Sequence, residues 1–509
     1  MRRLAAPGEA MTAAMHPARR MPNGLTVLAA LAVLTVAGVA HVGSPDVYYR
    51  GAAGPYQVGV VVRPPGVVPA QVDVVIQVFN GDVGRVTVQP VYWETGTAGA
   101  PPPDVAQPLA GAPGTYESRL WLMTTGSYTI DVAITGPRGT GTVNVPIVSA
   151  ATRELPMSPA LGAGLLLLGA FLVFGLLSIV GAASREATLD PGAPVDPHRR
   201  ARSRAAVAAA AAIFALALLG GNAWWNSSAR SYRRIIYVPL ANRATIVDSA
   251  GEHVLRFELT DARWSGREQT PLVPDHGKLV HLFLVRSPGM DAFAHLHPVT
   301  RDSNEFRVAV PRLPSGTYRV YADIVHRSGL AETLVNTVTM FPGGDAAPFT
   351  PTDSDDSWSS MPGASRDAMH ATLADGSIMT WDRGDTTIVA NQLAPLHFSV
   401  RTPDGRPAVL QPYMGMAAHA MVTRDDGSVF AHLHPMGTIA MAAQSLFDHR
   451  QSGDTSRATD ARIMAMPAAT LPDTISFPYA FPKPGHYRMW IQVRHDGRVL
   501  TGTFDATVR

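Results

Sequence analysis

Residues 293–298 read FAHLHP, and residues 430–435 read the same six letters. The likeness extends upstream, where HLFLVR begins at His281 before the first copy and HAMVTR begins at His419 before the second. It also extends downstream, where GTYRVYADIVH in the first copy aligns with GHYRMWIQVRH in the second. Four histidine positions therefore recur in register, which indicates a duplicated module whose histidines share a role.

The second copy contains a strong hairpin signal, the Asp-Gly pair at residues 426–427. Such a pair favours a two-residue type I′ turn, because both turn positions need a positive φ. A turn there sets His419 opposite His434 and Met421 opposite His432. Alternate strand residues share a face, and opposed Cβ atoms lie about 4.5–5.5 Å apart, so these four side chains are expected to project together.

The first copy has one residue more between its two strands, which a three-residue turn at residues 288–290 would absorb. This turn places His281 opposite His297 and Phe283 opposite His295. A phenylalanine therefore occupies the position that a methionine holds in the second copy. We expect the first copy to form the weaker site, less suited to Cu(I), because thioether sulfur favours the reduced ion.

The available ligand types favour copper. Cysteine is absent from the sequence, so a metal site must use imidazole, carboxylate or methionine sulfur. Imidazole ligates Cu(II) and thioether favours Cu(I), although imidazole also suits zinc. The candidate metal ligands are His281, His295, His297, His326, His419, His432, His434, His495, Met414, Met416 and Met421. The alternative is that these histidines are structural, and for the strand-end pair His326 and His495 a solvated cap is the competing interpretation.

Composition and turn spacing predict a mainly β protein, since 42 prolines and 45 glycines fit short strands better than long soluble helices. We predict three immunoglobulin-like β-sandwich modules, at residues 42–157, 249–342 and 366–509, with residues 343–365 as a flexible linker. The first module contains no histidine, so no metal role is expected there. An insertion after the second FAHLHP, at about residues 436–473, is interpreted as a disordered loop, with a metal-gathering arm as the alternative.

Two apolar runs predict transmembrane helices at residues 158–183 and 205–225, with a buried core helix as the alternative. The loop between them, residues 184–204, carries five arginines, which by the positive-inside rule places it in the cytoplasm. Residues 226–248 are then a juxtamembrane linker, and the modules on both sides lie outside the cytoplasm. Residues 1–41 are interpreted as a signal peptide or an N-terminal membrane anchor, which would be a third span.

The modules resemble the small extracytoplasmic β-sandwich domains of the YtkA-like, FixH-like and CopC-like copper-handling families. The resemblance is carried by LVHLFLVR with FAHLHP in the first copy and by YMGMAAHAMVTRDDGSVFAHLHPMG in the second. It implies metal handling in the cell envelope. Together with the topology predicted from the apolar runs, the expected location is the cytoplasmic membrane, with the soluble domains on its periplasmic side.

The leading hypothesis is a membrane-anchored extracytoplasmic protein that binds or buffers a transition metal, with copper as the favoured metal. The alternative is a non-catalytic docking module for other envelope membrane proteins, in which the histidines serve packing. An enzyme is not expected, because the sequence has no HExxH, GxSxG or P-loop motif. A net charge of +2 gives no indication of nucleic-acid binding.

Overall fold

The computed structural model describes residues 46–190, 192–249, 252–264, 272–300, 302, 304–341, 349–360, 368–453, 471 and 474–509. The predicted signal peptide or anchor at residues 1–41 lies outside the described residues. The described part of the chain is mainly β, with six sheets and three α-helices, which confirms the predicted fold class at this level. Each of three apolar cores is enclosed by two of the sheets.

The first sandwich encloses its core between the sheets β1-β2-β3-β7-β6 and β5-β4-β8-β9. Its strands are β1 (Val47–Ala53), β2 (Tyr56–Arg63), β3 (Ala70–Val78), β4 (Arg85–Tyr92), β5 (Asp104–Val105), β6 (Gln107–Pro108), β7 (Thr115–Leu122), β8 (Gly126–Gly136) and β9 (Gly139–Ser149), with a 3-10 turn at Thr97–Gly99. In β2, Val58, Val60 and Val62 are fully buried while the residues between them are not. This alternation is the period of a strand with one face on a core.

The second sandwich, called repeat 1, contains the first FAHLHP. Its sheets have the orders β10-β11-β15-β14 and β17-β16-β12-β13-β18. The strands are β10 (Asn242–Ser249), β11 (Glu252–Leu259), β12 (His281–Ser287), β13 (Ala292–Leu296), β14 (Val299–Thr300), β15 (Glu305–Ala309), β16 (Gly316–Val325), β17 (Ala331–Met340) and β18 (Ser357–Ser360). Repeat 1 thus begins at Asn242, inside the predicted juxtamembrane linker 226–248, because β10 pairs along its whole length with β11.

Strand β18 corrects the prediction of a flexible linker at residues 343–365. It pairs with β13 through His295 opposite Ser357 and Ala294 opposite Trp358, so it covers an otherwise open edge of the sheet. Polar composition suggested a linker, but Asp356 just before β18 accepts a hydrogen bond from the backbone N–H of His297 at 2.8 Å. That bond holds the segment against the hairpin.

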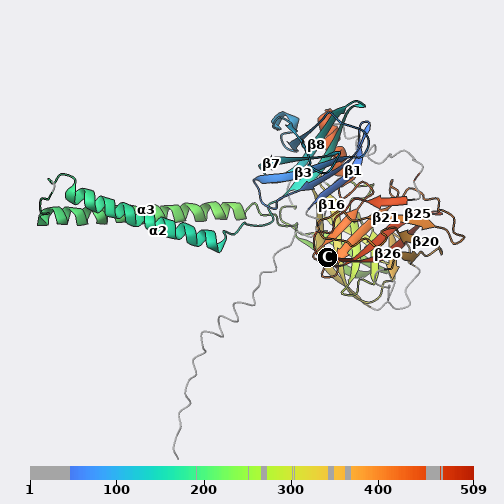
Figure 1. Cartoon of the computed structure of the whole chain (residues 1–509). Coiled ribbons are helices and arrows are strands. Elements are labelled where there is room, and N and C mark those ends of the chain that lie inside the picture. The colour runs from blue at the N-terminus through green and yellow to red at the C-terminus, as the bar shows by residue number, and fades with distance from the viewer. Residues whose placement is uncertain are drawn as a thin grey trace, which may run out of the picture. The chain divides into compact units, whose positions relative to one another are not determined.

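The third sandwich, called repeat 2, contains the second FAHLHP. Its sheets have the orders β19-β20-β21-β24 and β23-β22-β25-β26. The strands are β19 (His370–Thr372), β20 (Ile378–Trp381), β21 (Leu396–Arg401), β22 (His419–Arg424), β23 (Phe430–Leu433), β24 (Thr474–Phe477), β25 (Gly485–His495) and β26 (Arg498–Val508). Several of these strands are labelled in Figure 1, including β25 and its neighbour β26.

Part of the insertion in repeat 2 is helical, which corrects its interpretation as a disordered loop. Helix α4 spans Met441–Ser452 and buries Ala442, Ala443 and Phe447. It has no capping side chain of its own, and instead the backbone N–H of Ala442 donates to Oδ1 of Asp275 in repeat 1 at 2.9 Å. A cap supplied by a distant segment is not visible in local sequence.

Two long helices, α2 (Pro159–Glu186) and α3 (Pro197–Arg233), are long and apolar enough to cross a membrane. They lie side by side (Figure 1), with the Ser203 hydroxyl donating to the carbonyl of Gly181 at 2.7 Å. Both helices extend beyond the predicted spans. Four arginines of the predicted loop 184–204 lie in the first turns of α3. The reason is that Asp196 caps α3 and arginine is a good helix former.

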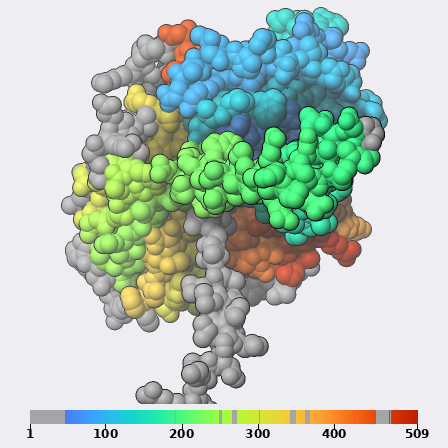
Figure 2. Space-filling model, turned by 90° about the vertical axis from the view of Figure 1, so that its left-hand side faces the viewer, coloured from blue at the N-terminus to red at the C-terminus, as the bar shows by residue number. Residues whose placement is uncertain are grey.

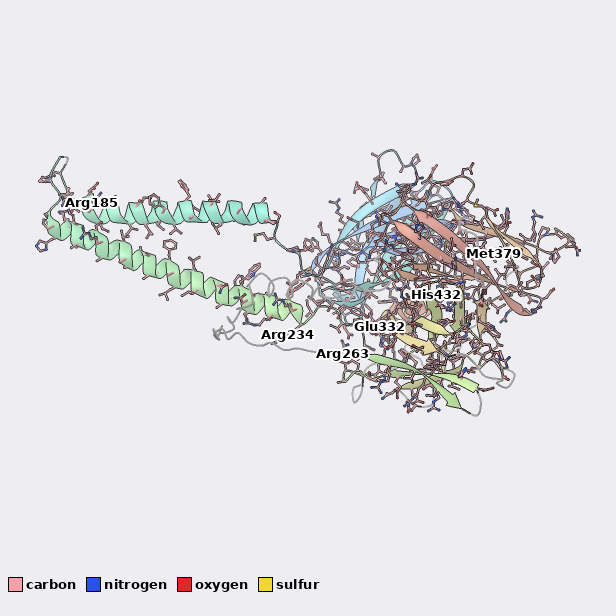
Figure 3. The ribbon with its side chains drawn as sticks, turned by 90° about the horizontal axis from the view of Figure 1, so that it is seen from below. Arg185, Arg234, Arg263, Glu332, Met379 and His432 are labelled. Carbon is pink, nitrogen blue, oxygen red and sulfur yellow. The ribbon has the colours of Figure 1, made fainter. Side chains whose placement is uncertain are left out.

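The apolar side chains of both helices are exposed over most of their length, and Figure 2 shows the two helices in green. In Figure 3, Arg185 and Arg234 mark opposite ends of the pair. Near the Arg234 end, Arg233 forms an ion pair with Glu154 at 2.7 Å, whereas four arginines lie in the first two turns of α3 at the other end.

Candidate metal centre

Both hairpins have the predicted register. In repeat 2, Met421 pairs with His432 across β22 and β23, and in repeat 1, Phe283 pairs with His295 across β12 and β13. The ring centroids of the outer pair in repeat 2, His419 and the second histidine of HLH, lie 5.1 Å apart. The corresponding distance in repeat 1 is 5.2 Å. The register was therefore predicted correctly, but the turn of repeat 2 is not type I′, because Gly427 has φ 72° whereas the φ of Asp426 is not positive.

The two histidine hairpins meet each other in one buried cluster, which the sequence did not predict. The ring centroid of His432 lies 5.3 Å from that of His281 and 5.8 Å from that of His295 in the other repeat. Figure 3 labels His432 among the strands. We call the cluster the histidine centre, and its members are His276, His281, His295, His297, His419, His432 and His434.

The packing of the two repeats is reciprocal, with equivalent residues exchanging contacts. Phe293 of repeat 1 stacks on Trp490 of repeat 2 at 4.7 Å between ring centroids. The equivalent pair, Phe430 of repeat 2 and Tyr321 of repeat 1, stacks at 4.1 Å. Such an exchange defines an approximate two-fold relation, so each repeat meets the other with the same face.

Two equivalent arginines repeat this pattern at the hairpin turns. Arg319 of repeat 1 donates to the carbonyl of Asp426 in the turn of repeat 2 at 2.8 Å. Arg488 of repeat 2 donates to the carbonyl of Met290 in the turn of repeat 1 at 2.9 Å. The turns that set the histidine register are therefore anchored by the opposite repeat.

His276 belongs to the centre although the sequence analysis did not select it. It lies in repeat 1, but its ring centroid is 4.9 Å from His434 and 5.4 Å from His419, both in repeat 2. Its backbone has φ 49°, so it occupies the left-handed region in a tight turn before β12. The available signal was its alignment, five residues before His281, with Met414, five residues before His419.

Two sets of three imidazoles are each compact enough to hold an ion. His276, His419 and His434 form one set, and within it the possible ligand atoms lie within 4.8 Å of one another. The second set, defined by the same limit, is His281, His295 and His297. Metal–nitrogen bonds of about 2.0–2.1 Å put two nitrogens on one ion about 3–4 Å apart, so small side-chain rotations suffice.

The ring nitrogens of His281 and His295 are arranged as ligating nitrogens would be. Nε2 of His281 lies 3.1 Å from the carbonyl oxygen of Asp275, and Nδ1 of His295 lies 2.9 Å from Oε1 of Gln492. If each oxygen accepts a hydrogen bond, both imidazoles present lone pairs on their other nitrogens. Those two nitrogens, Nδ1 of His281 and Nε2 of His295, face each other at 3.2 Å. A cation ligated by both would remove the resulting repulsion.

The second histidine of each HLH motif likewise has an oxygen beside one ring nitrogen and, among the described residues, an unpaired nitrogen on the other side of the ring. Nδ1 of His297 lies 3.0 Å from Oδ1 of the buried Asp356, and Nδ1 of His434 donates to the carbonyl of Ile439 at 3.1 Å. In both cases the Nε2 atom is buried and has no hydrogen-bond partner among the described residues. Oxygen acceptors on the far nitrogen are the usual supports of histidine ligands.

Burial keeps these imidazoles neutral. Desolvation, followed by the charges of neighbouring histidines, holds the pKa of His281, His295, His419 and His432 well below its ordinary value. The same causes lower the pKa of His276 to about 4. A neutral imidazole is the ligating form, so the centre has its ligands ready near neutral pH.

Two predicted histidine ligands lie outside the centre, and the three predicted methionines hold different places in repeat 2. His326 is hydrogen-bonded to Glu332 at 2.7 Å, and His495 lies 3.1 Å from a carboxylate oxygen of Asp375, so both strand-end histidines have carboxylate partners. Met421 packs in an aromatic cluster with residues of both repeats. Met416 closes the tight turn before β22. Met414, the other candidate in that turn, is buried with φ 49°.

The first sandwich and α4 pack beside the centre. The backbone N–H of Arg50 donates to the carbonyl of Met436 at 2.8 Å, directly after the second HLHP, and the N–H of Thr438 donates to the carbonyl of Tyr48 at 3.0 Å. Gly437 between them has φ 122°, and a Cβ there would collide with the Tyr48 carbonyl. The histidine-free first sandwich thus helps to fix the position of the second HLHP.

Comparison with known proteins adds one family and three distant folds. A family described as "Domain of unknown function (DUF8832)" matches residues 371–509, which is most of repeat 2. No curated protein matches the chain.

Among solved structures, latent PorU from Porphyromonas gingivalis is similar at 9% identity and a TM-score of 0.13, over 91% of this chain and 34% of that one. Alpha-2-macroglobulin from Escherichia coli is similar at 9% identity and a TM-score of 0.16, over 91% and 31%. The SGBP-B protein of the mixed-linkage glucan utilization locus of Bacteroides ovatus is similar at 10% and 0.11, over 86% and 64%. This chain spans about a third of the first two, and scores this low carry no argument.

Proposed function

We propose that this protein is a membrane-anchored, extracytoplasmic metal-binding protein whose histidine centre holds copper. One observation carries the proposal: ring nitrogens with oxygen acceptors behind them face each other in the buried interior. Six ring nitrogens of the centre, on five imidazoles, have no hydrogen-bond partner among the described residues. Leaving a buried polar atom unpaired costs about 1–3 kcal/mol, so a cluster of them needs a compensating ligand.

Copper is favoured over other divalent ions by the donor set. The seven imidazoles of the centre are neutral nitrogen donors, and nitrogen sites bind Cu²⁺ more tightly than the other first-row divalent metals. Zinc is the competitor, because imidazole alone suits it as well. The resemblance of the HLHP motifs to copper-handling envelope domains adds support of a different kind.

Membrane anchoring is proposed on the two apolar helices and their charges. Four arginines at the start of α3 and Arg185 at the end of α2 lie at the same end of the pair, which favours the cytoplasmic side for that end. The sandwiches then lie on the periplasmic side of the cytoplasmic membrane. Their antiparallel two-sheet construction also supports the proposal that the three modules are immunoglobulin-like.

The test is metal titration of the full chain, purified in detergent and stripped of metal. We expect tight copper binding and weaker zinc binding. His419→Ala or His434→Ala should weaken copper binding by at least about tenfold, the scale for losing part of a metal site. His370→Ala is the matched control, because His370 is exposed on β19 and lies outside the centre.

Two results would contradict the proposal. One is that the full chain binds neither copper nor zinc at micromolar concentrations. The other is that the double variant His419→Ala, His434→Ala binds as tightly as the parent. Either result would indicate that the histidines have a structural role at the interface between the repeats. The docking-module alternative would then be the better account.

A further inference from the structure

The equivalence of the two repeats extends to the turn that precedes each hairpin. DHGK at residues 275–278 aligns with YMGM at residues 413–416, each turn ending three residues before its histidine strand. His276 and Met414 both have φ 49°, and the glycines that follow them have φ 84° and 79°. The first and last residues of both turns form equivalent antiparallel bridges. His276 and Met414 therefore hold the same position in the two repeats.

His276 reaches out of its own repeat. Its ring contacts those of His419 and His434, and its ligand atom belongs to their compact set. Its Nε2 is buried without a hydrogen-bond partner among the described residues. The turn thus delivers a donor atom from repeat 1 to the histidines of repeat 2.

Some of the supporting contacts of the centre also cross between the repeats. Gln492 of repeat 2 lies against Nδ1 of His295 in repeat 1, and Asp323 of repeat 1 lies 3.2 Å from Nδ1 of His432 in repeat 2. Asp323 and Gln492 hold equivalent positions in the two repeats. Asp323 pairs with His281 across the sheet of repeat 1, and Gln492 pairs with His419 across the sheet of repeat 2. Tyr413, next to Met414, also crosses, with its hydroxyl 3.4 Å from Nδ1 of His295.

We propose that the histidine centre holds two metal ions in non-equivalent sites with crossed ligands. His276 of repeat 1 completes the site of His419 and His434, and Met414 of repeat 2 completes the site of the other three histidines. Those three are His281, His295 and His297. This inference rests on the proposed metal-binding function and adds the number of sites and the origin of one ligand in each.

The crossing makes the two sites chemically different. Met414 is buried, with 8% of its surface exposed, at the position equivalent to that of His276. A thioether beside three imidazoles favours Cu(I), whereas a site with imidazole donors only accepts Cu(II) readily. The reduced-ion site is therefore assigned to repeat 1, the opposite of the assignment that Phe283 and Met421 suggested, since Met421 is used in aromatic packing.

The experiment compares copper bound per chain and Cu(I) affinity in the full, detergent-purified protein. The parent is expected to bind two copper ions per chain. Met414→Leu should keep both Cu(II) ions but lower the Cu(I) affinity of one site by at least about tenfold, measured against a chromophoric Cu(I) chelator. Met489→Leu is the matched control, because Met489 is fully buried in the core of repeat 2 and the exchange conserves volume.

A second variant tests the other site. His276→Asn removes the imidazole but keeps a residue that tolerates the left-handed backbone at this turn. It should reduce Cu(II) affinity at one site by at least about tenfold and leave the Cu(I) affinity of the Met414 site unchanged. The double exchange His276→Met, Met414→His should move the Cu(I) preference to the other repeat, an outcome that a purely structural role would not give.

The outcomes separate this inference from the function on which it rests. One copper per chain, or a Met414→Leu variant with unchanged Cu(I) affinity, would overturn the crossed two-site arrangement while leaving copper binding intact. No bound metal at all would overturn both. Two ions with separate responses to Met414→Leu and His276→Asn would establish the arrangement.

Discussion

Repeat 1 and repeat 2 share a hairpin but differ in what surrounds it. Their histidines align at every position of the two strands, and their arginines, Arg319 and Arg488, anchor each other's turns. The turns before the hairpins differ, with His276 in one and Met414 in the other. The duplicated backbone therefore provides a symmetric frame in which single side-chain differences make the two halves chemically distinct.

The two repeats also differ in how the chain continues after HLHP. In repeat 1 the chain turns at once into β14, and β18 covers the edge of the hairpin. In repeat 2 it enters α4, which packs on the first sandwich, where Gln444 donates to the carbonyl of Asn144 at 2.7 Å. The first sandwich therefore packs against the segment that follows HLHP in repeat 2. In repeat 1 the edge of the hairpin is covered instead by β18.

The largest expected difference concerns the second residue after each HLHP. Gly437→Ala in repeat 2 should destabilise the protein by at least about 3 kcal/mol, because the new Cβ meets the Tyr48 carbonyl at a left-handed φ. The equivalent change in repeat 1, Thr300→Ala, should cost about 1 kcal/mol or less, since Thr300 is exposed. Denaturant unfolding of the metal-free protein measures both. Equal costs would show that the first sandwich does not constrain this turn.

A smaller asymmetry is expected between the two anchoring arginines. Arg488 is buried and also forms an ion pair with Asp505 at 2.6 Å, so Arg488→Met leaves a carboxylate without its partner and should cost about 2 kcal/mol. Arg319 is half-buried, and Arg319→Met should cost only about 1 kcal/mol. The measurement is again unfolding by denaturant. A larger cost for Arg319 would contradict this reading of the interface.

A pH-dependent effect is expected at α4, which occurs in repeat 2 after HLHP and not in the described part of repeat 1. Burial raises the pKa of Asp131, which accepts a hydrogen bond from Gln451 of α4, to about 7. The unfolded carboxyl has its ordinary pKa of 3.8, so between pH 4 and 7 the folded state binds more protons. Asp131 therefore costs stability progressively as the pH rises through that range.

Asp131→Asn removes this titration. The variant should gain melting temperature relative to the parent at pH 8, and the gain should shrink at pH 5. Both proteins are measured free of metal, so that the histidine centre contributes equally. A gain that is the same at both pH values would contradict the raised pKa of Asp131.

The local part of the site could be predicted from sequence, and the reason is that its determinants are local. The Asp-Gly turn and the alternation of a strand fix which residues oppose one another, so the pairing of Met421 with His432 followed from the ten residues between them. The apolar runs likewise located α2 and α3, although capping by Asp196 moved the start of α3.

The meeting of the two hairpins could not be predicted, because it depends on contacts between segments more than a hundred residues apart. No local pattern marks Gln492 as a support for His295, or Asp275 as the cap of α4. His276 lacks a local signal for a related reason: only its equivalence to Met414 marks it, and that position in repeat 2 carries sulfur rather than imidazole.

The central claim is that imidazoles of both repeats hold one shared metal centre. The most direct measurement is the X-ray absorption spectrum of the copper-loaded full chain, compared with that of the His281→Ala, His419→Ala variant. We predict nitrogen donors at about 2.0 Å with the outer-shell scattering of several imidazoles, and a clear loss of that scattering in the variant. A parent spectrum without imidazole scattering, or one that the variant leaves unchanged, would contradict the account.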